Sequence, residues 1–477
     1  MTVGVRDARP AGAPAPVTPL RARRVDRAQL RVLLAGRGLL GRFTYLVATQ
    51  AVTVALGLAY WTVTARLFPA GSVGVAAAAT STATLLGTLG VLGVSTVLLV
   101  TLGSIDPEEE RPLVSTAMLV AGASVLLLAV GAWALSPLLG PSLRALGASP
   151  VDAVLFVVGA VETTCGSVLD SAAIGLRRGP AQLARNAVAS FLKVVLVVAA
   201  VELAARTATG LLVAWDVALG ISLLLAPRLL HLHGAGGRHV GLATRLGLVR
   251  RFWSLSIAHH LLNLAIGSIS YALPVIAALL VAPREMAYFS IAQLVASSIL
   301  LLPFLLATSL FVESTGDEAA LRHNVRRTFP VGLACCAALL AVFEPGAPVV
   351  LSVFGHEYEA NGITALHLLL LGGLPYVVKD HFMAIRRAQN RLGEATRLGL
   401  LSTAGELLGA AVGGALDGLT GLCAAWVVTT VLEAACFLPA VLRVLRSGHG
   451  GGTPSAAGEV RVAGAGDAVV VRDVALP

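Results

Sequence analysis

Long apolar runs separated by short polar loops fill most of the chain. A helix needs ~20 predominantly apolar residues to cross the hydrocarbon core of a bilayer. Twelve runs reach that length. Their expected limits are 43–65, 73–102, 113–136, 151–175, 183–204, 208–230, 252–281, 286–312, 329–354, 362–385, 396–416 and 419–443. The ninth run is interrupted by the segment EPGAP at 344–348. The pattern predicts an all-α, polytopic membrane protein with about 12 transmembrane helices.

Composition supports this prediction. The chain is 56% hydrophobic and 13% charged, whereas a soluble domain carries about 25% charged residues. Its mean hydropathy is +0.84. We interpret the net charge of +9 as basic cytoplasmic loops and not as a nucleic-acid-binding surface, because basic residues gather on the cytoplasmic side of membrane proteins.

Loop charges also predict the orientation of the chain. With a cytoplasmic N-terminus, most arginines fall on the inner side, and we count Arg185 and Lys379 among these inner charges. The outer side receives only Arg66, Arg144, Arg206 and Arg284. This asymmetry follows the positive-inside rule. It predicts a multi-pass protein of the cell inner (plasma) membrane with both termini in the cytoplasm.

The chain divides into two halves with similar opening spans. RFTYLVATQAVTVALG (42–57) and RFWSLSIAHHLLNLAIG (251–267) both begin with Arg-Phe and carry polar residues about two turns later. We therefore expect two six-helix pseudo-repeat bundles, as in many transporters. The expected regions are a disordered basic N-tail (1–40), a first bundle (41–230), a basic connecting loop (231–251), a second bundle (252–445) and a disordered C-tail (446–477).

Polar residues form stripes on the two opening spans. In the seventh span Ser256, His259 or His260, Asn263 and Gly267 recur at helical spacing and share one face. Gln50 and Thr53 form a similar stripe in the first span. Small and polar residues are common at helix–helix contacts, whereas histidine in a membrane usually faces the bundle interior or a wet cavity. Both interpretations stay open.

Charged residues lie deep in several predicted spans of the first half. Glu162, Lys193 and Asp216 fall near mid-span in the fourth, fifth and sixth spans, and Asp170 lies two turns beyond Glu162. An isolated charge at the bilayer centre costs at least ~2.5 kcal/mol on insertion scales. These residues therefore form either a structural ion network or a site that couples transport to a proton or sodium ion.

The second half offers two further polar candidates. Gln293 falls in the eighth span, and Glu406 lies in the eleventh span on a face with Ser402, Gly409 and Gly413. The small residues leave room beside the carboxylate, which favours a cavity-lining role for Glu406. A buried structural acid is the alternative.

Motifs for catalysis and cofactors are missing from the sequence. It has no GxxxxGK[ST] phosphate loop and no HExxH zinc motif, and we identify no Ser/His/Asp set. All five cysteines fall in apolar segments without a CxxC pair, which is typical of packing residues. We therefore expect no catalytic residue, no metal site and no cofactor, and we do not expect an enzyme.

Three stretches of the second half resemble a known family. They are REMAYFSIAQLVASSILLLPFLLATSLFVES (284–314), LSVFGHEYEANGITALHLLLLGGLP (351–375) and AIRRAQNRLGEATR (384–397). They resemble the polysaccharide-export and O-antigen flippase branch of the multidrug/oligosaccharidyl-lipid/polysaccharide exporter superfamily. The resemblance covers most of residues 40–445.

The resemblance implies two six-helix bundles around a central cavity that opens alternately to each membrane face. The implied substrate is a polyprenyl-linked oligosaccharide or related glycolipid, flipped to the outer leaflet for cell-surface polysaccharide export. Arg42 and Arg251, at matching positions of the two halves, would gather phosphates at the inner mouth. Implied partners are membrane lipids, a coupling proton or sodium ion, and glycosyltransferases or a polymerase of the same pathway.

Two other functions stay open at this point. Flippases of pyrophosphate-linked lipids tend to line the cavity with arginines, whereas here only Lys193 lies deep. The first alternative is an ion-coupled multidrug or metabolite exporter of the same fold. The second is a membrane enzyme or a scaffold of an envelope polysaccharide complex.

Overall fold

A computed structural model of the chain describes residues 53–203, 205–230, 241–314 and 316–446. Arg42, Gln50, the N-terminal tail, residues 231–240 of the connecting loop and nearly all of the C-terminal tail lie outside these residues. The regular structure within them is helical throughout, which confirms the predicted all-α class.

The helices of the first half follow a helical stretch at 53–67. They are α3 (Ala70–Gly90), α4 (Val94–Thr101), α5 (Pro107–Leu135), the 3-10 helix η1 (Ser136–Leu138), α6 (Pro141–Gly147), α7 (Pro150–Gly175), α8 (Gly179–Glu202) and α9 (Ala208–Leu229). Proline in the first turn opens α5, α6, α7 and α8, where its missing N–H has no helical partner to lose. Ser149 and Thr207 cap α7 and α9 through their side chains.

The second half begins with the long helix α10 (Leu242–Leu280). It continues with α11 (Pro283–Ile299), α12 (Leu301–Ser314), α13 (Glu318–Ser352), α14 (His356–Leu371), α15 (Gly373–Ala388) and α16 (Leu392–Arg446). The segment EPGAP does not interrupt the structure, since α13 runs through Pro345 and Pro348 to Ser352. Membrane helices tolerate proline where neighbouring groups satisfy the freed carbonyls.

Eight helices in the described ranges are long and apolar enough to cross a membrane. Helices α11 and α12, bent by 49° relative to each other, form a ninth candidate if they are counted as one span. The predicted first span, 43–65, begins before the described residues, which cover only its part from residue 53 onward. The expected number of about 12 is therefore matched only in part.

Helix α16 is an antiparallel hairpin that contains two predicted spans, 396–416 and 419–443. Asp417 leaves helical geometry and Gly418 has φ +55°, a left-handed conformation that favours glycine. Beyond this turn the two legs touch through backbone. A Cβ added at Gly413 would lie 2.1 Å from the Gly421 carbonyl oxygen. The small-residue pattern of this segment thus permits the close approach of its legs.

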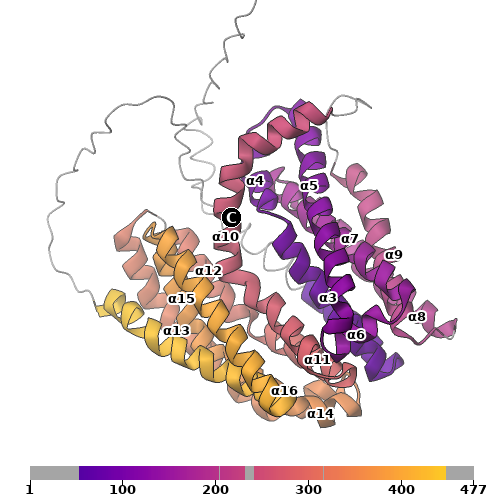
Figure 1. Cartoon of the computed structure of the whole chain (residues 1–477). Coiled ribbons are helices and arrows are strands. Elements are labelled where there is room, and N and C mark those ends of the chain that lie inside the picture. The colour runs from indigo at the N-terminus through magenta and orange to yellow at the C-terminus, as the bar shows by residue number, and fades with distance from the viewer. Residues whose placement is uncertain (1–52, 204, 231–240, 315, 447–477) are drawn as a thin grey trace, which may run out of the picture. The chain divides into compact units, whose positions relative to one another are not determined.

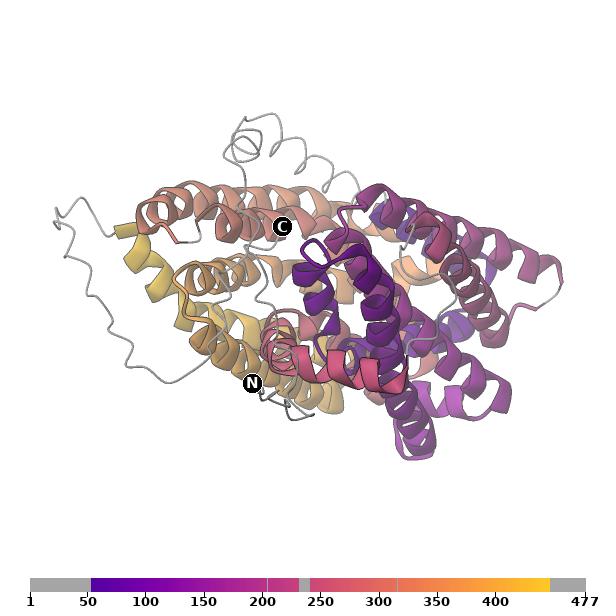
Figure 2. The same ribbon diagram turned by 90° about the horizontal axis from the view of Figure 1, so that it is seen from above.

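Helices pack mainly within their own half. In both views the indigo-to-magenta helices α3–α9 lie together, and the orange-to-yellow helices α13–α16 lie together (Figures 1 and 2). Contacts between the halves run through α3, which packs on α10 and α11, and through α10. At Gly74 of α3 a Cβ would lie 1.6 Å from the Pro283 carbonyl oxygen. Glycine is required there because two backbones meet.

Candidate functional site

A pocket of about 380 Å³ lies among α10, α11, α12, α14, α15 and α16. Its lining is mostly apolar. The polar side chains that reach it include Ser270, Gln293, Tyr376, Asp380 and Trp426. A largely apolar cavity with a few convergent polar groups is the usual form of a small-molecule site.

One helix break and one pair of glycines border this pocket. Helices α11 and α12 bend at Leu300 and Leu301, and both leucines line it. Helices α14 and α15 meet at Gly372 and Gly373. A Cβ at Gly372 would lie 2.4 Å from the Trp426 ring, and one at Gly373 would lie 2.5 Å from the Leu300 side chain. The two glycines therefore let the pocket walls approach each other.

A buried ion cluster of Lys379, Glu406 and Glu433 stands behind the pocket wall. The Lys379 ammonium pairs with Glu406 and lies 3.4 Å from Glu433 Oε2. The Glu406 side chain is 0% exposed. Ser402 donates a hydrogen bond to Glu433. This cluster joins α15 to both legs of α16.

Two pocket-lining aromatic residues are held by the same carboxylate. The Tyr376 hydroxyl donates to Glu406 Oε2 at 2.7 Å, and Trp426 Nε1–H donates to the same oxygen at 2.9 Å. A buried charge requires such partners, because its desolvation otherwise costs several kcal/mol. Glu406 therefore acts on the pocket indirectly, because it orients Tyr376 and Trp426, which line it.

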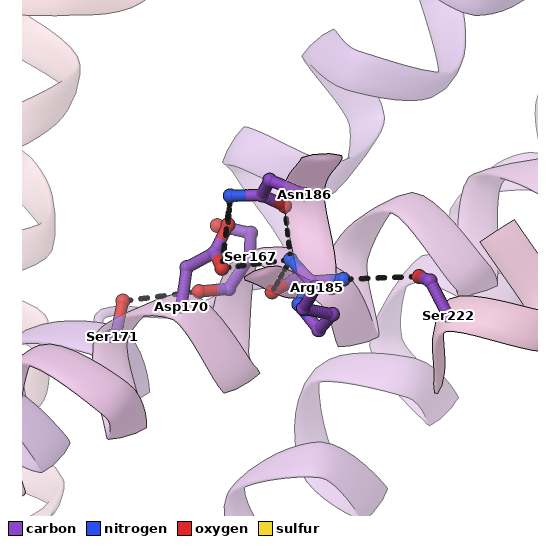
Figure 3. A network of polar contacts seen from close by, with 7 residues as sticks. Ser167, Asp170, Ser171, Arg185, Asn186 and Ser222 are labelled. Carbon is purple, nitrogen blue, oxygen red and sulfur yellow. Dashed lines mark hydrogen bonds and ion pairs between the residues drawn. The ribbon is translucent and has the colours of Figure 1, made fainter. Parts of the chain in front are cut away.

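The first half contains a second buried ion network (Figure 3). Arg185 of α8, only 5% exposed, pairs with Asp170 of α7 at 2.7 Å. Its guanidinium also donates to the Gly166 carbonyl, to Asn186 Oδ1 and to Ser222 of α9. The network joins α7, α8 and α9. Asp170 thus pairs with Arg185, one of the predicted inner charges, and not with Lys193.

The other deep charges of the first half lie near one another, since Asp216 interacts electrostatically with both Glu162 and Lys193. Lys193 Nζ lies 3.2 Å from the centre of the Trp215 ring, a cation–π contact. Glu162 and Asp216 meet at the α7–α9 contact, where each carboxylate lies against a glycine of the opposite helix, Gly220 and Gly159 respectively. One oxygen of each, Glu162 Oε2 and Asp216 Oδ2, is buried without a hydrogen-bond partner among the described residues.

The stripe on α10 faces two different surroundings. Ser256 Oγ donates to the Leu92 carbonyl, Asn263 Nδ2 donates to Thr96 Oγ1 at 3.1 Å, and His260 is 7% exposed. These contacts place this end of α10 against α3 and α4. Further along, Gly267 and Ser270 line the pocket. The His259 side chain lies outside the described residues.

The remaining candidates also divide between pocket and periphery. Gln293 lines the pocket and donates to the Ser270 carbonyl at 3.5 Å. Thr53 and Arg251 are exposed, and neither lines the pocket. Sequence reasoning missed Lys379 and three polar residues of the pocket lining, Tyr376, Asp380 and Trp426. The apolar neighbours of Lys379 in PYVVKDHFMAI (375–385) were the available signal of burial.

Comparison with known proteins establishes the fold. No protein-family model matches the chain, and no curated protein matches its sequence. An inward-facing multidrug resistance MATE family transporter of the MOP superfamily superposes with a TM-score of 0.60 at 17% identity, covering 82% of this chain and 94% of that one. The lipid II flippase MurJ in an inward closed conformation superposes with a TM-score of 0.63 at 11% identity, covering 84% and 90%. The fold is that of MOP-superfamily transporters. Identities this low establish the fold alone.

Proposed function

We propose that the protein is an alternating-access membrane transporter that moves an amphipathic substrate between the two membrane faces. The first candidate substrate is a polyprenyl-linked oligosaccharide or related glycolipid, flipped from the inner to the outer leaflet of the plasma membrane. The observation that carries the proposal is the pocket bordered by the break between α11 and α12, with apolar walls and a few polar groups. Broken helices line the substrate sites of many transporters.

The pocket suits a substrate with both apolar and hydroxyl-bearing parts. Gln293 and Asp380 supply hydrogen-bonding groups at its wall. The hydrogen-bonding groups of Tyr376 and Trp426 are engaged by Glu406, so these two residues present their rings. Aromatic rings pack on the apolar faces of sugars or on lipid chains, while the polar groups replace part of the hydration that a sugar loses in the membrane. Glycosyltransferases of the same pathway would supply such a substrate.

A flipping assay tests this proposal directly. Purified protein is reconstituted into vesicles with a fluorescent lipid-linked oligosaccharide, and transbilayer movement is followed by quenching from outside. We expect protein-dependent movement of the labelled lipid. Replacing Gln293 with leucine should slow it, whereas Gln182→Leu, distant in sequence and outside the pocket, should not. Absence of movement, together with efflux of an amphipathic dye, would overturn the glycolipid assignment.

The second candidate is an ion-coupled multidrug or metabolite exporter. Three carboxylates, Asp380, Glu406 and Glu433, lie at or behind the pocket wall beside one ammonium, that of Lys379. This excess of negative charge favours a neutral or cationic substrate over a pyrophosphate. Efflux of cationic dyes that depends on a proton or sodium gradient, without lipid flipping, would establish this candidate instead.

A further inference from the structure

A second pocket, of about 230 Å³, lies where α15 ends and α16 begins and ends. Three arginines line it: Arg386, Arg391 and Arg443. They come from the last turn of α15, the turn before α16 and the last turn of α16. The fold thus brings together guanidinium groups that are separated by up to 57 positions in the sequence (386 to 443).

Among the described residues, the acidic groups beside this second pocket do not balance its positive charge. Glu394 pairs with Arg386 at 3.3 Å and with Arg391 at 3.5 Å. One carboxylate therefore serves two guanidiniums, and Arg443 lies near enough to repel that of Arg386. Like charges held close together repel one another, and this repulsion is stronger where the surroundings have a low dielectric constant. An anion bound among them would remove that cost.

The arginines of this pocket also have hydrogen-bond donors that are not used by the described residues. Arg386 Nε is buried without a hydrogen-bond partner among the described residues, although Nη1 donates to Gln389 at 3.3 Å. Arg391 is exposed, and Arg443 is exposed as well. Arginine presents a planar fork of donors that matches a phosphate group. The arrangement therefore offers several donors to one tetrahedral anion.

The floor of the second pocket is apolar. Phe382 and Ile385 line it beside the arginines, and Phe382 stacks on Phe437 at a ring separation of 4.3 Å. The pocket lies at the ends of membrane-length helices, the level at which lipid headgroups meet protein. An apolar floor below a basic rim matches a phosphate that carries acyl chains.

We propose that this pocket binds the phosphate group of an anionic phospholipid at the membrane surface. Arg391 and Arg443 contact the phosphate from the rim, and Arg386 contacts it from below. A free phosphate shares the same chemistry, and the experiment below separates the two sources. The proposal does not depend on which substrate the 380 Å³ pocket of the second half moves.

Native mass spectrometry of the full-length protein in a neutral detergent tests the proposal. Phosphatidylglycerol and phosphatidylcholine with identical acyl chains are titrated against wild type, the site variant Arg391→Gln/Arg443→Gln and the control Arg322→Gln/Arg397→Gln. The control removes the same charge from residues that do not line this pocket. Unchanged thermal unfolding of both variants verifies folding.

We expect wild type and control to prefer phosphatidylglycerol, and the site variant to lose ~10-fold or more in affinity for it, since each lost hydrogen bond to a charged group accounts for about that factor. Competition by millimolar inorganic phosphate would assign the site to a free phosphate, and its failure would assign the site to the lipid. Equal phosphatidylglycerol binding by wild type and site variant, or an equal loss in the control, would overturn the proposal.

Discussion

Two buried ion networks, one in each half, use similar chemistry with different consequences. In the first half Arg185 ties α7, α8 and α9 together through Asp170, whose side chain is 26% exposed. In the second half Lys379 ties α15 to both legs of α16 through Glu406, which is fully buried. Of the two, the second network also holds aromatic side chains that line the 380 Å³ pocket of the second half.

The Asp170 network holds three helices together, whereas the Glu406 network also fixes side chains of the pocket wall. Arg185 keeps three other acceptors if Asp170 is lost, namely Gly166, Asn186 and Ser222. Glu406 has Lys379, Tyr376 and Trp426 as its donors. A change at Glu406 therefore reaches the pocket wall, whereas a change at Asp170 stays within three helices.

The largest effect is expected for Lys379→Ala. It leaves Glu406 buried beside Glu433 without its cation, and breaking a buried pair in this way costs ~3–5 kcal/mol. Thermal unfolding in detergent should show a clear loss of stability. The double variant Lys379→Ala/Glu406→Gln should recover part of it, because the uncompensated anion is gone. Additive losses in the double variant would mean that the two residues are not coupled.

A smaller effect is expected for Asp170→Asn. Asparagine still accepts a hydrogen bond from Arg185, and the side chain at this position is partly exposed, so we expect a loss of ~1–2 kcal/mol in stability. Transport per folded molecule should match wild type. A loss of transport at unchanged stability would place Asp170 in the transport mechanism itself.

Tyr376→Phe sharpens the comparison at the pocket. The ring remains while the hydroxyl that donates to Glu406 is removed, which costs ~1 kcal/mol or slightly more. Because the ring loses its anchor, we expect a change in apparent substrate affinity that exceeds the effect on stability. The control is Tyr271→Phe, another tyrosine of the pocket lining. An equal change in apparent substrate affinity in both variants would mean that the contact between Tyr376 and Glu406 has no special role.

The smallest effect is expected for His260→Gln. His260 lies where α10 packs on the first half and does not line the 380 Å³ pocket. Glutamine keeps a polar side chain there, so transport and its pH dependence should stay close to wild type in the vesicle assay. A lost or shifted pH dependence would restore the interpretation of His260 as a titrating cavity residue.

The fold was largely predictable because apolar runs and loop residues are local signals. The Asp417–Gly418 turn separates two predicted spans at the expected place, and the small residues near Glu406 do face a close neighbour. The ion pairs were not predictable, since they join residues 15 positions apart (170 and 185) and 27 apart (379 and 406). Counting loop charges also assigned Arg185 and Lys379 to the inner surface, although both are buried. The position of a cation near the end of a span does not reveal whether a carboxylate of another helix will pair with it.

The most direct test is the lipid-linked oligosaccharide flipping assay on wild type, Glu406→Gln and Asp170→Asn, each reconstituted at equal amounts of folded protein. Wild type and Asp170→Asn should move the labelled lipid at similar rates. Glu406→Gln should be strongly slowed, because Tyr376 and Trp426 lose the anion that holds them at the pocket wall. Equal rates for the two variants would contradict the account.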